Sequence, residues 1–135
     1  MFRILIVTHG QFGRELLRSA ELIVGKQDNI DTLGLEHGEC ADELGEKVFN
    51  WIVQRNQEGN NALVLTDLFG GTPTNVTLAN MHKLDFKCIT GVNLPMLIEI
   101  INNSDVDLDS LVEFSSEVGR KGIRVIDNSI LKKKS

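Results

Sequence analysis

His9 lies one residue after the most hydrophobic short run of the chain, residues 2–7, and Asp67 directly follows a second such run, residues 62–66. A neutral imidazole has one basic nitrogen and one N–H, and a carboxylate that accepts from the N–H leaves the basic nitrogen facing a ligand. The carboxylate also stabilises positive charge on the ring when the basic nitrogen attacks an electrophile. We therefore predict that His9 is a nucleophile and that Asp67 orients it.

The turn after Asp67 has the composition of an anion-binding site. Gly70 and Gly71 let the backbone approach a ligand closely, and Thr72 followed by Pro73 is typical of a helix N-cap and first helical residue. The first N–H groups of a helix have no partner within the helix and, with the helix dipole, favour an anion. The Thr72 hydroxyl can add a donor, although capping competes for it. An imidazole nucleophile beside this turn indicates a phosphoryl group, with Gly70, Gly71 and Thr72 as its binding residues.

Other chemistries have little support in the sequence. The three histidines and two cysteines show no metal-ligand spacing, so we expect neither a metal nor a cofactor. Walker A, G-x-G-x-x-G and G-x-S-x-G motifs are absent. A net charge of -5 and a pI of about 5.1 argue against nucleic acid as a partner. Two cysteines far apart in the sequence, and no apolar run of membrane-spanning length, predict a cytoplasmic protein with free thiols.

Short apolar runs alternate along the chain with longer segments of helical period, which is typical of a parallel sheet covered on both faces. We predict one domain over residues 1–135 with a doubly wound α/β fold, a mostly parallel sheet in the common order 2-1-3-4 and a final strand. In that order the strands before His9 and Asp67 are neighbours, and a ligand binds beyond their carboxyl ends. The predicted strands are 2–7, 30–35, 62–66, 86–92 and 122–127, and the predicted helices are 12–24, 41–57, 72–84, 96–102 and 107 or 109–118.

Three segments carry a family pattern: VTHG at 7–10, TDLFGGTPxN at 66–75 and GVNLPML at 91–97. Together they resemble the mannose-family IIA component of the bacterial phosphoenolpyruvate-dependent sugar phosphotransferase system, over nearly the whole chain. The resemblance implies that His9 takes a phosphoryl group from phospho-HPr and passes it to a IIB component, with Asp67 as its orienting partner. It also implies that Thr72, which is often serine in the family, contacts the phosphate.

The resemblance further implies an assembly. Family members form homodimers in which the last, antiparallel strand can be exchanged between subunits, and residues 122–127 fit that use. Many members carry IIB on the same chain after a flexible linker, and this sequence ends at Ser135 without one, so we expect a separate IIB polypeptide. The membrane components IIC and IID select the sugar and would be only indirect partners, which leaves the sugar open.

Two residues and two alternative functions stay open at this point. Phe69, in the glycine-rich turn, is either buried or part of a docking surface, and Asn93 either starts a helix or forms a wall of the site. The phosphotransferase subunit of dihydroxyacetone kinase is one alternative, but that relative lacks the DLFGGTP segment. A non-catalytic anion-binding, flavodoxin-like module is the other, and it gives no reason for the pairing of His9 with Asp67. The ring nitrogen of His9 that would carry the phosphoryl group is also open.

Overall fold

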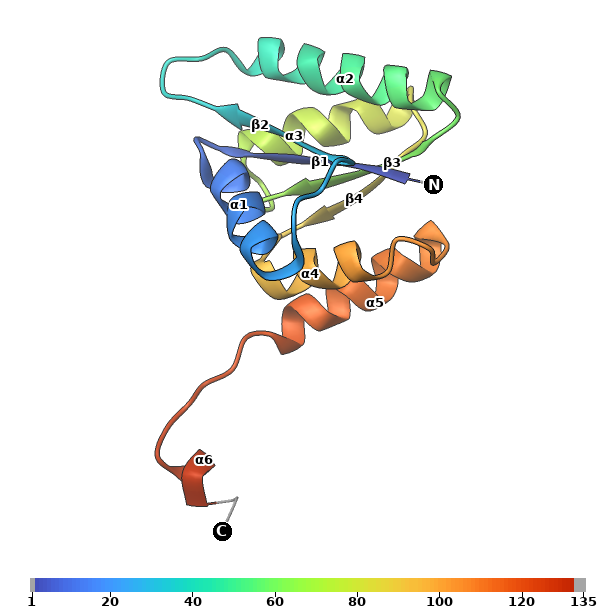
Figure 1. The fold of residues 1–135 in the computed structure, drawn as a ribbon. Coiled ribbons are helices and arrows are strands. Elements are labelled where there is room, and N and C mark those ends of the chain that lie inside the picture. The colour runs from blue at the N-terminus through green and yellow to red at the C-terminus, as the bar shows by residue number, and fades with distance from the viewer. Residues whose placement is uncertain (1, 133–135) are drawn as a thin grey trace.

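A computed structural model describes residues 2–132, and a four-stranded parallel sheet lies at its centre (Figure 1). The strand order β2-β1-β3-β4 confirms the predicted order 2-1-3-4. β1 pairs in parallel with β2 on one side and with β3 on the other. The strand order therefore reverses between β1 and β3, where the switch point was expected. The strands are β1 (Phe2–His9), β2 (Ile30–Leu35), β3 (Asn61–Thr66) and β4 (Lys87–Thr90).

The near-continuous apolar sequence of β1 follows from its burial on both faces. Successive side chains of a strand point to opposite sides of the sheet. Ile4 and Ile6 therefore lie in one core, while Leu5 and Val7 lie in the other. Each fully buried side chain of this size contributes on the order of 2 kcal/mol to folding. The same run of residues thus holds His9 at the end of the most deeply packed strand.

Helices cover both faces of the sheet, which confirms the predicted fold class (Figure 1). α1 (Phe12–Val24) and α4 (Leu94–Asn102) cover one face, and α5 (Leu108–Lys121) packs against α4. α2 (Ala41–Gln57) and α3 (Thr72–Ala79) cover the other face. Within residues 2–132, no helix is both long and apolar enough to cross a bilayer.

Several element boundaries differ from the predictions by a few residues, those of β1, α4 and α5 among them. The helix predicted to reach residue 84 ends at Ala79, where Asn80 begins a 3-10 turn and its side-chain amide donates to the Val76 carbonyl. The strand predicted over 86–92 is confined to β4. Gly91, at φ 84°, turns the chain there, and its N–H donates to the Thr66 carbonyl.

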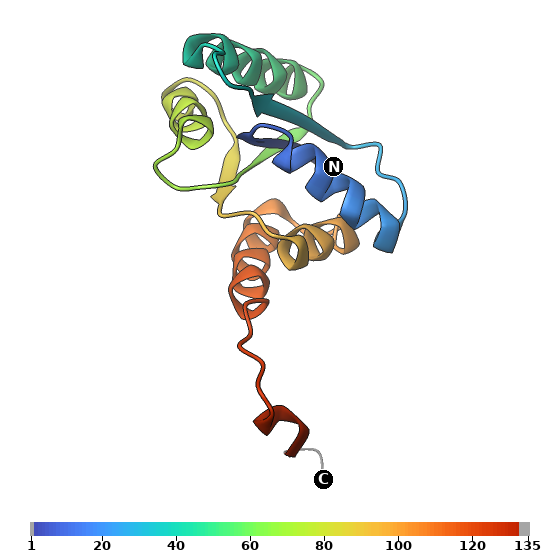
Figure 2. The same ribbon diagram turned by 90° about the vertical axis from the view of Figure 1, so that its left-hand side faces the viewer.

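The predicted strand over residues 122–127 is not formed within this chain. After α5 the backbone leaves the body and runs to the short helix α6 (Ser129–Lys132) (Figure 2). A strand forms only where a neighbour supplies N–H and C=O partners, and none of the strands described here lies beside this segment. Ile123, Val125 and Ile126 are therefore 78%, 95% and 70% exposed. Exchange of this segment between subunits stays a prediction.

Candidate active site

His9 and Asp67 are in contact at the carboxyl ends of β1 and β3, the location predicted from the sequence. The backbone N–H of His9 donates to Asp67 Oδ2 at 2.8 Å, and His9 Nδ1 lies 2.8 Å from the same oxygen. The two side chains differ in exposure, with 50% of the His9 side chain and only 13% of the Asp67 side chain accessible. A largely buried carboxylate thus holds His9 both at its backbone N–H and at its half-exposed ring.

This geometry determines the tautomer of His9. An ionised carboxylate can only accept hydrogen bonds, so Nδ1 carries the ring hydrogen and Nε2 is the basic nitrogen. Asp67 Oδ1 is buried and has no hydrogen-bond partner among the described residues. The Asp67 carboxylate can stabilise positive charge that develops on the ring when the opposite nitrogen reacts. The pair is therefore arranged for a nucleophilic Nε2 whose ring becomes cationic during reaction.

Two small residues that the sequence analysis did not single out hold the end of β1 in place. The buried Thr8 hydroxyl accepts from the Gly13 N–H at 2.8 Å and donates to the His9 carbonyl at 3.2 Å. Gly34, on β2, lies so close to the Gly10 carbonyl oxygen that a Cβ there would overlap it. A threonine and a glycine inside apolar strands are the sequence signals that could have found these supports.

The glycine-rich turn lies against the imidazole. A Cβ added to Gly71 would be 2.9 Å from His9 Cε1 and 3.5 Å from Nε2, so the backbone of this turn borders the reactive edge of the ring. Gly70 has a φ of 89°, which favours glycine. The prediction that Thr72 is the N-cap of α3 is wrong by one residue. Gly71 is the N-cap and Thr72 the first helical residue, so the Thr72 hydroxyl is not spent on capping.

The first turn of α3 follows Gly71, whose backbone borders the imidazole, and it offers backbone donors. The first hydrogen bond of the helix runs from the Asn75 N–H to the Gly71 carbonyl. The N–H groups of Thr72 and Thr74 therefore precede any acceptor within the helix, while Pro73 has no N–H. These donors and the helix dipole favour an anion at the N-terminus of α3, next to the turn that borders the imidazole.

Phe69 and Asn93 have different surroundings. Phe69 is 76% exposed and its neighbour Leu68 59%, so both form an apolar rim close to His9 rather than core. Asn93 is the N-cap of α4: its side chain accepts from the Met96 N–H at 3.0 Å and donates to the Gly119 carbonyl at 2.9 Å. The Asn93 amide thus ties α4 to α5 and makes no hydrogen bond with the His9–Asp67 pair.

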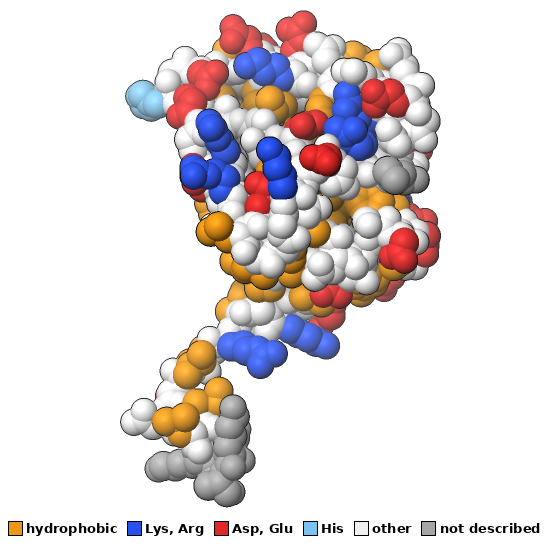
Figure 3. All heavy atoms as spheres, in the orientation of Figure 1, with side chains coloured by type: hydrophobic (Ala, Val, Ile, Leu, Met, Phe, Trp, Pro, Cys, Tyr) orange, Lys and Arg blue, Asp and Glu red, His pale blue; other side chains and the backbone are white. Residues whose placement is uncertain are grey.

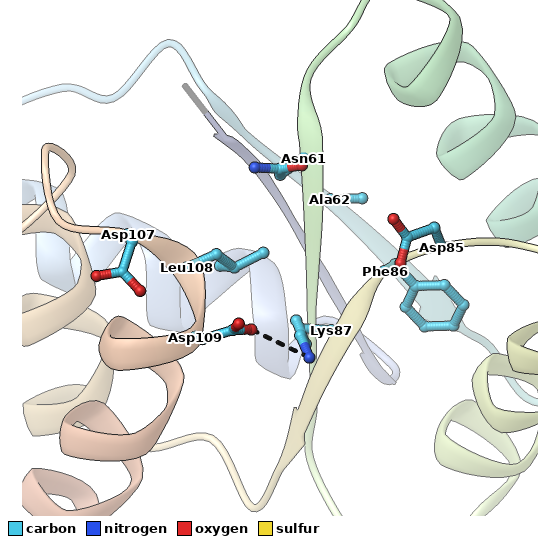
Figure 4. A pocket seen from close by; sticks show the side chains of 8 residues that line it. All are labelled: Asn61, Ala62, Asp85, Phe86, Lys87, Asp107, Leu108 and Asp109. Atoms are coloured by element: carbon cyan, nitrogen blue, oxygen red, sulfur yellow. Dashed lines mark ion pairs between the residues drawn. The ribbon is translucent and has the colours of Figure 1, made fainter.

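A separate hollow lies at the opposite end of the strands (Figure 4). It has a volume of about 400 Å³ and includes Asn61 and Lys87, the first residues of β3 and β4. Lys87 Nζ is paired there with Asp109 at 3.1 Å. No group of three or more His, Cys, Asp or Glu side chains among the described residues could hold a metal ion. The His9–Asp67 pair lies at the other, carboxyl end of the sheet.

Fold and site together define a class: a doubly wound α/β protein with an aspartate-oriented histidine at the switch point of its sheet. Residues 3–115 match the family model described as PTS system fructose IIA component. The chain belongs to this family of phosphotransferase-system (PTS) IIA components, and the resemblance seen in its three motifs is confirmed. It is thus a mannose-family IIA component.

Individual relatives agree with this family. The mannose-specific EIIAB component of Escherichia coli K12 is 34% identical over 126 residues, which cover 91% of this chain and 39% of that protein. This chain therefore spans well under half the length of that relative. The fructose-specific EIIA component of Bacillus subtilis is 32% identical over 76% of this chain and 70% of its own length. The crystal structure of EIIA from Streptococcus agalactiae aligns with a TM-score of 0.84 and 32% identity, covering 96% of this chain and 99% of that one.

Proposed function

We propose that this chain is a cytoplasmic phosphocarrier that accepts a phosphoryl group from phospho-HPr on His9 and passes it to a IIB component. One observation carries the proposal: Asp67 Oδ2 binds Nδ1 of His9 at 2.8 Å, and this contact leaves Nε2 as the free, basic nitrogen. The family match and the names of the relatives favour this role over dihydroxyacetone kinase chemistry and over a passive anion-binding module.

The transfer balances without an added base or metal. The Nε2 lone pair attacks phosphorus, the P–N bond to the donor imidazole breaks, and its electron pair returns to the donor. Because Nε2 carries no hydrogen, no proton has to leave it, and the positive charge that spreads over the ring is stabilised by Asp67 at Nδ1. The N–H groups of Thr72 and Thr74 and the Thr72 hydroxyl receive the equatorial oxygens. Transfer to IIB is the same step in reverse.

Both partners must reach the same nitrogen, so the docking surface has to surround it. Leu68 and Phe69 lie on one side of His9 with most of their side-chain surface exposed, and Phe12, 49% exposed, follows His9 at the start of α1. An exposed apolar rim of this kind suits partners that bind briefly and leave. Since the His9 side chain is itself half-exposed, transfer can take place without opening of the fold.

We further propose a homodimer in which each tail, residues 123–131, pairs with the free edge of the partner's β4. Beside that edge lies a hollow of about 410 Å³, lined by Cys88, Ile89, Thr90 and residues of α4 and α5. The tail carries exposed apolar side chains, and Figure 3 shows hydrophobic side chains on its surface. They are Ile123, Val125, Ile126, Ile130 and Leu131, of which Ile123 also lines this hollow. A chain truncated after Lys121 should be monomeric by light scattering while the full chain is dimeric. A full chain that is monomeric at high concentration contradicts the dimer.

The phosphocarrier role is tested by incubating the chain with phosphoenolpyruvate, enzyme I and HPr and measuring its intact mass. We expect the gain of one acid-labile phosphoryl group, its loss in His9→Ala and its retention in the matched control His37→Ala. His37 lies in the exposed loop after β2. If the folded wild-type chain takes up no phosphoryl group, the proposal is overturned. If His9→Ala takes up a phosphoryl group, a residue other than His9 is phosphorylated.

A further inference from the structure

Thr74 joins the two halves of the site through a hydroxyl that the phosphocarrier mechanism does not use. It lies in the first turn of α3 and is 1% exposed. Its Oγ1 is 2.6 Å from the Leu68 carbonyl, 2.7 Å from Thr66 Oγ1 and 3.3 Å from Thr90 Oγ1. A helix, two strands and the turn that follows Asp67 therefore meet at one buried oxygen.

The directions of these hydrogen bonds follow from the chemistry of the groups. A carbonyl oxygen can only accept, so the single hydrogen of the Thr74 hydroxyl points at Leu68. The Thr66 and Thr90 hydroxyls must then donate to the lone pairs of Thr74. Each group in the cluster therefore has a defined role, and valine at position 74 would leave the Leu68 carbonyl without this donor.

The two residues held by Thr74 are the neighbours of Asp67 in the chain. Thr66 is tied through its side chain and Leu68 through its carbonyl, so the backbone on both sides of Asp67 is anchored to α3. Asp67 in turn holds the His9 backbone N–H and Nδ1. The anchor lies on the same helical turn that carries the N–H groups proposed to receive the phosphoryl oxygens.

We propose that Thr74 is a positioning residue: its hydroxyl sets the distance between the Asp67 carboxylate and the anion-binding turn of α3. The Thr74 hydroxyl touches neither His9 nor the phosphoryl group and acts through Leu68 and Thr66, whereas the Thr74 backbone N–H is the group proposed to receive a phosphoryl oxygen. This inference rests on the proposed phosphocarrier function, because it assigns Thr74 a part in that transfer. It also makes a structural statement, that the His9–Asp67 contact depends on Thr74, which is measurable without any transfer.

The test compares Thr74→Val with Thr77→Val in the full chain. Thr77 is also buried in α3, but its hydroxyl donates at 2.8 Å to the Pro73 carbonyl of its own helix and does not reach the turn after Asp67. Thr77→Val thus controls for the loss of a buried hydroxyl. Thr74→Ser keeps the donor and should restore the wild-type behaviour. Thr74→Ala, which inserts no methyl group between the Thr66 and Thr90 hydroxyls, is the second variant if Thr74→Val does not fold.

Two readouts separate the possible failures. Hydrogen exchange of the His9 backbone N–H, which donates to Asp67, should be faster by about tenfold in Thr74→Val but not in Thr77→Val. The rate of transfer from phospho-HPr should fall by about tenfold in the same variant, since small displacements of a reacting group are costly. If wild-type chain takes up no phosphoryl group, the proposed function fails and the exchange result still decides the role of Thr74. If Thr74→Val matches Thr77→Val in both readouts, the positioning role is wrong.

Discussion

Gly71 lies so close to His9 that a single methyl group would enter the space of the imidazole. A Cβ on Gly71 would be 2.9 Å from His9 Cε1, nearer than such atoms normally approach. The backbone of Gly71 is ordinary, with φ -87° and ψ 165°, so an alanine there fits the chain but not the ring. The glycine is therefore needed for the neighbouring histidine rather than for the conformation of the turn.

Gly71→Ala should lower phosphoryl transfer by about tenfold, because the imidazole must shift, while the melting temperature changes little. Gly59→Ala is the matched control. It lies after α2 at φ 81° with open space around it, so alanine there should cost stability, about 1 kcal/mol, without affecting transfer. Stopped-flow transfer and thermal unfolding of both variants measure the two effects. Equal rates for wild type and Gly71→Ala would show that the ring tolerates the contact.

Asp67→Asn should slow transfer by about ten- to a hundredfold while the fold is retained. An amide can still accept from His9, but it carries no charge to stabilise a cationic ring, and a charge-assisted hydrogen bond contributes about 1.5–3 kcal/mol. Asp31→Asn is the control, since the Asp31 carboxylate accepts from Trp51 Nε1 instead. Single-turnover rates from phospho-HPr decide the matter, and an unchanged rate would remove Asp67 from the mechanism.

Gly34→Ala should destabilise the fold by about 1–3 kcal/mol, the usual cost of overpacking. The added Cβ meets the backbone carbonyl of Gly10, which cannot rotate away, and would disturb the 2.8 Å hydrogen bond from the Gly10 N–H to the Leu35 carbonyl. Gly45→Ala should have the opposite sign. In the interior of α2 its Cβ would make an ordinary 3.4 Å contact with Val76, and alanine favours a helix by about 1 kcal/mol over glycine. Urea unfolding of both variants measures the two changes in the free energy of unfolding, which should decrease in Gly34→Ala and increase in Gly45→Ala.

Stability should fall at high pH because of Cys88. Burial raises the pKa of its thiol from 9.0 to about 11. Below pH 9.0 the thiol is protonated in both states, and between pH 9.0 and about 11 the unfolded chain loses this proton first. The free energy of unfolding should therefore decrease across this window, by on the order of 2 kcal/mol. Cys88→Ala should lack this part of the decrease, and parallel pH profiles for the two chains would contradict the burial argument.

The sequence predicted the arrangement of the sheet because strands buried on both faces are apolar throughout. The runs at 2–7 and 62–66 could therefore be recognised as strands from the sequence. Because these two strands are parallel neighbours, the residues that follow them lie at the same edge of the sheet. The N-cap of α3 was predicted at Thr72 instead of Gly71, because a threonine before a proline fits the N-cap position when the local sequence is considered alone. The turn from Leu68 to Gly71 decides where helical backbone begins. Residues 122–127 alternate like a strand, but a strand also requires a partner edge, which no pattern within the segment can supply.

By itself the sequence determined the reacting groups: an imidazole, a carboxylate and a glycine-rich turn at the ends of two strands. Only the tertiary structure decided how they are oriented. The pairing of Asp67 with Nδ1, on which the proposal of Nε2 as the reacting nitrogen rests, depends on a contact between residues 58 positions apart. The role of Thr74 depends likewise on two strands and a turn that meet at its hydroxyl. Such contacts depend on how the sheet packs against α3. The local sequence patterns that predict a helix or a strand do not predict them.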